Sequence, residues 1–69
     1  MNGAQFIRKA RKWGRKNGAR FTEETKRGKG GHIILRRDNG QWTTVKTDEI
    51  GPGLKAAMLE QLGIPPGAF

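Results

Sequence analysis

The chain has 69 residues, so it forms one small domain, which we expect to span residues 1–69, and an enzyme with two domains around a deep cleft is excluded. It carries 14 Lys and Arg against 6 Asp and Glu, a formal net charge of +8, and only 33% of its residues are hydrophobic. The lack of cysteine excludes disulfides, cysteine zinc sites and a thiol nucleophile, and the single histidine excludes a histidine-rich metal site.

The positive charge is concentrated at the start of the chain. Half of the basic residues lie within the first 20 positions, with no acidic residue among them: Arg8, Lys9, Arg11, Lys12, Arg15, Lys16 and Arg20. Such a field attracts polyanions, which favours nucleic acid as a partner and leaves an acidic protein as the alternative. An anionic membrane fits less well, because a surface-bound helix needs a broader apolar face. No apolar run approaches the ~20 residues of a membrane span and no signal-peptide core is present, so we expect a cytoplasmic protein.

The first predicted element is a helix over residues 3–17. Its apolar positions fall on one side at helical spacing: Phe6, Ile7, Ala10 and Trp13. Asn2 is suited to cap the start, and Gly18 to end the helix. Gly14 within it costs about 1 kcal/mol relative to alanine.

Three strands are expected next, over residues 20–26, 32–37 and 41–46. The last two are separated by Asp38-Asn39-Gly40, and Asn-Gly is a strong hairpin signal. A two-residue Asn39-Gly40 turn would pair Arg37 with Trp42 and Ile34 with Val45, and would place His32 on the face of Ile34 and Val45. A longer loop would shift the pairing by one residue, and the sequence leaves both registers open.

The last predicted element is a helix over residues 51–62, with Pro52 in its first turn and an irregular tail over residues 64–69. Four apolar residues mark the face expected to pack on the rest of the domain: Leu54, Ala57, Met58 and Leu62. The order helix, three strands, helix predicts an α+β fold in which both helices cover one face of a three-stranded antiparallel sheet.

The segment that precedes the second strand is the strongest candidate site. It reads Lys26-Arg27-Gly28-Lys29-Gly30-Gly31-His32. Glycines let the backbone N–H groups approach a phosphate, and the three cations add charge. At the start of a strand, the His32 imidazole can take a proton from a ribose 2′-hydroxyl or give one to a leaving oxygen. The alternative is an ordinary glycine-rich loop beside a surface histidine.

Other residues offer weaker candidates. The adjacent acidic pairs Glu23-Glu24 and Asp48-Glu49 would point to opposite faces of a strand, so paired-carboxylate catalysis and a magnesium site are not expected, and any RNA cleavage should need no metal. Thr43, Thr44 and Lys46 are placed to contact phosphates, although such residues are also common in strands. Trp42 is open to stack on bases, whereas Trp13 is expected in the core.

These segments together resemble the HicA family of bacterial toxins, which belong to type II toxin–antitoxin pairs. The resemblance covers about residues 5–65 and is carried by the loop that ends in His32, by Trp42-Thr43-Thr44-Val45, and by the run from Ile50 to Ile64, which reads Ile-Gly-Pro-Gly-Leu-Lys-Ala-Ala-Met-Leu-Glu-Gln-Leu-Gly-Ile. Gly31 stands where the family usually has serine, which removes a hydroxyl beside the histidine.

The family resemblance implies a fold similar to a double-stranded-RNA-binding domain and an mRNA interferase, an endoribonuclease that cuts mRNA without the ribosome; with the carboxylate pattern above, we expect it to be metal-independent. It implies that His32 is the catalytic residue and that a HicB-type antitoxin neutralises the toxin. With the residue-based reasoning, the expected RNA-binding residues are Lys26, Arg27, Lys29, Gly30, Gly31, Thr44 and Lys46. A non-catalytic RNA-binding module and a basic protein that only sequesters an acidic partner remain alternatives.

Overall fold

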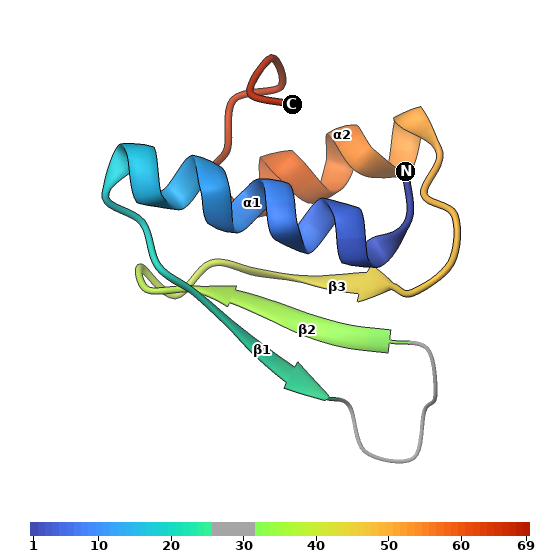
Figure 1. Cartoon of the computed structure of the whole chain (residues 1–69), viewed down its shortest axis with the longest axis horizontal. Coiled ribbons are helices and arrows are strands. Elements are labelled where there is room, and N and C mark those ends of the chain that lie inside the picture. The colour runs from blue at the N-terminus through green and yellow to red at the C-terminus, as the bar shows by residue number, and fades with distance from the viewer. Residues whose placement is uncertain (26–31) are drawn as a thin grey trace.

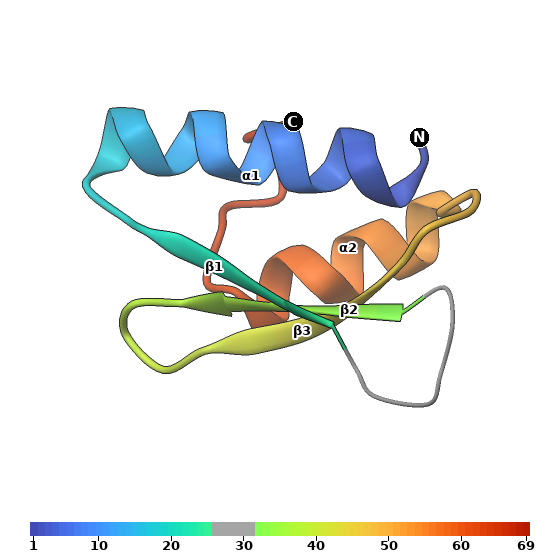
Figure 2. The same ribbon diagram turned by 60° about the horizontal axis from the view of Figure 1, so that its bottom comes forward.

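A computed structural model describes residues 1–25 and 32–69 (Figure 1). The elements follow the predicted order: α1 (Gly3–Asn17), β1 (Phe21–Thr25), β2 (His32–Arg37), β3 (Trp42–Lys46) and α2 (Pro52–Gln61). The strands form one antiparallel sheet in the order β1-β2-β3, and both helices lie on the same side of it (Figure 2). The predicted α+β fold is therefore confirmed. Neither helix in the described part of the chain has the length and apolar character of a bilayer span.

Local sequence signals fix both ends of α1. The backbone N–H of Gln5 donates to the Asn2 side chain at 2.9 Å, and the Gln5 side chain accepts from the Asn2 N–H at 2.9 Å, so the first turn has a complete capping box. Gly18 ends the helix in the left-handed region, with φ of 72°, which glycine adopts without a steric penalty. Helix α1 therefore begins and ends where the sequence predicts.

The hydrophobic core lies between the helices and the sheet. From α1 it contains Phe6, Ile7 and Ala10, and its other members include Phe21, Leu35, Val45, Met58, Leu59 and Leu62. Trp13 is half-buried and packs against this core, with its ring 6.5 Å from that of Phe21, as expected. The core covers only one face of the sheet, because both helices lie on that side.

The β2–β3 hairpin uses the longer of the two loops considered. The N–H of Arg37 donates to the Gln41 carbonyl at 2.7 Å, and the N–H of Gly40 donates to the Arg37 carbonyl at 2.9 Å, so residues 38–40 form the loop. Gly40 has φ of 96°, whereas Asn39 has negative φ, which excludes the type I′ turn of a two-residue loop.

The three-residue loop excludes the register that a two-residue turn would give. Arg36, not Arg37, pairs with Trp42, and Ile34 pairs with Thr44 rather than Val45. His32 therefore shares a face with Ile34 but not with Val45, which lies in the core on the other side.

Helix α2 packs through a narrower face than its apolar spacing predicts. Met58 and Leu62 are buried as expected, but Leu54 is 41% exposed and Ala57 is also exposed, while Leu59 is buried. The C-terminal end of α2 is held tightly, because the Arg37 guanidinium donates to the Leu62 carbonyl at 2.8 Å. The prediction that Leu54 and Ala57 are core residues is therefore wrong: the side of α2 that carries them lies beyond the sheet edge.

Gly14 and Gly53 offer a matched test of this packing. A Cβ at Gly14 would overlap the Ala19 carbonyl oxygen, whereas a Cβ at Gly53 in α2 would meet nothing within 4 Å. We predict that Gly14→Ala lowers the free energy of unfolding by about 1–3 kcal/mol. Gly53→Ala should leave it equal or raise it by up to about 1 kcal/mol, because alanine favours the helix. Urea denaturation measures both, and a stabilising Gly14→Ala would contradict the close approach of α1 and the chain that enters β1.

Candidate functional site

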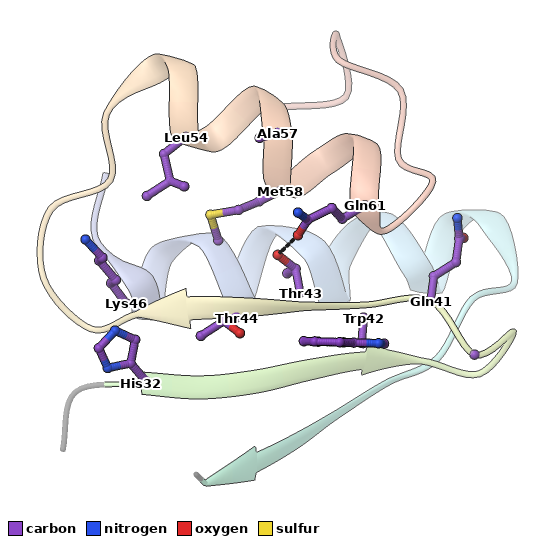
Figure 3. Close-up of a pocket in the computed structure, with 11 residues that line it drawn as sticks. His32, Gln41, Trp42, Thr43, Thr44, Lys46, Leu54, Ala57, Met58 and Gln61 are labelled. Carbon is purple, nitrogen blue, oxygen red and sulfur yellow. Dashed lines mark hydrogen bonds between the residues drawn. The ribbon is translucent and has the colours of Figure 1, made fainter. Parts of the chain in front are cut away.

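The face of the sheet that the helices leave uncovered carries the candidate site. We call it the open face, and β2 and β3 contribute to it His32, Ile34, Arg36, Trp42, Thr44 and Lys46. These residues share one face because side chains alternate along a strand and cross-strand partners point the same way. Figure 3 shows His32, Thr44 and Trp42 in a row along the two strands.

His32 lies at one end of this row, beside a cation. It is the direct cross-strand partner of Lys46. Hydrogen-bonded and non-hydrogen-bonded pairs alternate along an antiparallel ladder, and Arg37 and Gln41 are hydrogen-bonded to each other. Counted along the strands from that pair, His32 and Lys46 form a non-hydrogen-bonded pair, in which the Cβ atoms are about 4.5–5.5 Å apart. Thr44 is the diagonal neighbour of His32 on β3, at about 7–8 Å. The imidazole is only partly buried, so a ligand in solvent can reach it.

The polar groups around His32 are not engaged with the rest of the described chain. Within residues 1–25 and 32–69, no side-chain hydrogen bond involves His32, Thr44 or Lys46. Farther along the open face, the Arg36 guanidinium lies 3.3 Å from the Glu24 carboxylate. An imidazole, an ammonium and a hydroxyl at these spacings can hold a phosphodiester and move a proton beside it.

A groove of about 720 Å³ runs from His32 along β3, with α2 as its second wall. The strand side of the groove includes two polar residues, Thr44 and Lys46, and the indole of Trp42. The helix side is contributed by Leu54, Ala57, Met58 and Gln61. Sequence reasoning missed Leu54 and Ala57 as site residues, because their spacing on an amphipathic helix is that of core positions.

Thr43 and Thr44 are adjacent on β3 but have different roles. Thr43 is buried, and its hydroxyl donates to the Gln61 side-chain oxygen at 2.5 Å, which joins β3 to α2. Thr44 lies on the open face in the predicted RNA-binding set. The structure therefore separates the two threonines that the sequence placed together as phosphate contacts.

The basic residues of α1 lie on the far side of the sheet from His32. Its exposed cations include Arg8, Lys9, Lys12, Arg15 and Lys16, and both helices cover the face opposite the open one (Figure 2). Arg11 forms an ion pair with Glu23 at 2.7 Å. The cations of α1 therefore form a second surface and do not converge on the His32 ring.

The glycine-rich part of the predicted site lies outside the described residues. It comprises Lys26, Arg27, Lys29, Gly30 and Gly31. Their predicted phosphate contacts stay predictions, and the chain places them directly before His32. In the described ranges, no group of three or more His, Asp or Glu side chains is arranged to hold a metal ion.

The two threonines also give a matched test of the strand orientation. We predict that Thr43→Ala costs about 1–2 kcal/mol more unfolding free energy than Thr44→Ala, because it removes a partly buried hydrogen bond and a buried methyl group. Both substitutions are Thr→Ala on the same strand, so the difference between them reports mainly on what each side chain contacts. Thermal or urea unfolding measures it, and equal costs would contradict the orientation of β3.

The family model described as the HicA toxin of bacterial toxin–antitoxin systems matches residues 7–64, which include most of α1, all three strands with His32, and α2. Neither the curated proteins nor the solved structures give a significant match. The match spans most of the chain and agrees with the resemblance seen in the sequence, so the protein belongs to the HicA toxin family.

Proposed function

We propose that this HicA-family toxin is an mRNA interferase, an endoribonuclease that cleaves message in the cytoplasm with His32 as its catalytic residue. One observation carries the proposal: His32 lies partly exposed on the open face, with Lys46 as its direct cross-strand partner. The membership in a toxin family that acts on RNA supports the choice of substrate.

In this mechanism the cations position the scissile phosphate. Lys46 and Thr44 contact it from β3, and Lys26, Arg27, Lys29 and the backbone N–H groups of Gly30 and Gly31 contact it from the segment before His32. Such contacts neutralise the charge that builds up on the phosphorus oxygens in the transition state. The groove is lined by both His32 and Trp42, at opposite ends of β2 and β3, which suits a polymer that enters and leaves along its length.

The chemical step uses the substrate's own nucleophile. His32 takes the proton of the ribose 2′-hydroxyl, and the resulting O2′ attacks the adjacent phosphorus. The P–O5′ bond breaks, and the leaving oxygen takes up a proton from water, which gives a 2′,3′-cyclic phosphate and a 5′-hydroxyl. DNA lacks the 2′-hydroxyl and is not a substrate. One positioned base contributes about 10²–10⁴-fold in rate.

A HicB-type antitoxin is the proposed partner. An antitoxin that covers the open face would block access to His32, because His32 lies on that face. Acidic segments of the same partner would bind the exposed cations of α1 on the other side of the sheet. The two surfaces together explain how one partner can inhibit the toxin and hold it.

The test is His32→Ala. We predict that it lowers cleavage of a labelled transcript by at least about 10²-fold. Binding of the variant to a 2′-O-methyl RNA, which cannot be cut by this route, should stay within a few-fold of the parent protein. A transcript that stays intact with the parent protein would favour the non-catalytic RNA-binding module, and cleavage that survives the substitution would remove His32 from the mechanism.

A further inference from the structure

Trp42 is exposed on the open face without an evident structural role. Its side chain is 54% exposed, and only Leu54 joins it as an exposed large hydrophobic residue in the described part of the chain. Within that part its ring has no aromatic or cation partner, whereas Trp13 packs against Phe21 and lies under the Arg37 guanidinium at 5.2 Å. Trp42 and Leu54 line the same groove, so the two large apolar side chains that the described chain exposes lie together at the candidate site, and exposed apolar surface in a groove indicates a ligand.

The distance between Trp42 and His32 indicates what kind of ligand could contact both residues. The pairs His32–Lys46 and Arg36–Trp42 are four residues apart along the strands, or about 13 Å. Stacked nucleotides rise by about 3.4 Å each. A base stacked on Trp42 would therefore belong to a nucleotide no more than about four nucleotides from the phosphodiester bond at His32. Both residues line the same groove, which allows one strand to contact both.

We propose that Trp42 is a base-stacking platform that makes single-stranded RNA the substrate of this site. The inference rests on the proposed function and adds the substrate class. Single-stranded RNA is commonly bound by aromatic side chains on a sheet, with neighbouring cations on its phosphates. Arg36, the cross-strand partner of Trp42, supplies such a cation when its guanidinium exchanges the Glu24 carboxylate, 3.3 Å away, for a phosphate.

The same geometry selects against a double helix. In an A-form duplex the bases stack on one another and only their edges reach the grooves, so an indole has no free base face to cover. Double-stranded-RNA-binding domains bind a duplex by its shape, through 2′-hydroxyl and phosphate contacts instead. Trp42 therefore favours an unpaired strand, although the family resemblance implies a fold similar to that of double-stranded-RNA-binding domains.

The test measures binding in the His32→Ala background, so that the RNA is not cut. The probe is a fluorescein-labelled single-stranded RNA of mixed sequence and about 12 nucleotides, compared with the same strand annealed to its complement. Trp42→Ala should weaken binding of the single strand by about 5- to 150-fold and leave binding of the duplex unchanged. Trp42→Phe should restore most of the affinity, because a phenyl ring also stacks.

Leu54→Ala is the control, because Leu54 is the other exposed apolar residue of the groove, and it should change the affinity for RNA by less than Trp42→Ala does. Circular dichroism checks that each variant is folded. Equal affinity of Trp42→Ala and its parent for the single strand would overturn the inference and leave the cleavage chemistry standing. Equal losses for single strand and duplex would also overturn it. If the parent itself binds no RNA, both the inference and the proposed function fail.

Discussion

The length of the turn between β2 and β3 decides what this molecule presents to a ligand. Gly40, with φ of 96°, closes a loop over residues 38–40, and this loop sets the pairing of the two strands. A one-residue change in register would turn every side chain of β3 to the other face of the sheet. Thr44 and Lys46 would then lie under the helices, and Val45 would lie beside His32. The candidate site exists because the hairpin takes the longer loop.

The sheet divides the protein into two surfaces with different properties. Helix α1 presents a dense set of exposed cations, which raises attraction for polyanions at long range but does not reach the His32 ring. The open face carries fewer charges and more varied chemistry: an imidazole, a lysine, a hydroxyl and an exposed indole. In the proposed function, long-range attraction and RNA recognition would thus use different surfaces, and an antitoxin would hold one surface and cover the other.

Most of the fold could be predicted from the sequence because its signals are local. Asn2 and Gly18 bound α1, Pro52 begins α2, and the Asn-Gly pair marks the hairpin. The register could not be predicted, because residues 33–35 are a continuous apolar run, so either face of β2 offers hydrophobic residues to the core. Asn-Gly is also compatible with both loops, since glycine can take positive φ in each.

Only part of the candidate site could be predicted, again because the register could not be predicted. His32, Thr44 and Lys46 could be named from residue type and position, but their shared face depends on the register. Leu54 was assigned to the core because its spacing is amphipathic, and only the placement of α2 at the sheet edge shows that it lines the groove. Sequence patterns show which residues of an element are apolar, whereas tertiary placement decides which of them are covered.

In the proposed function, RNA binds the open face and not the helix side of the sheet. The chain has two tryptophans, and they report on opposite sides: Trp42 on the open face and Trp13 against the helix-side core. Titration of ¹⁵N-labelled His32→Ala protein with single-stranded RNA, followed through the two indole N–H resonances, tests the claim directly. We expect the Trp42 resonance to shift and that of Trp13 to stay in place. A shift of Trp13 with Trp42 unmoved would contradict the account.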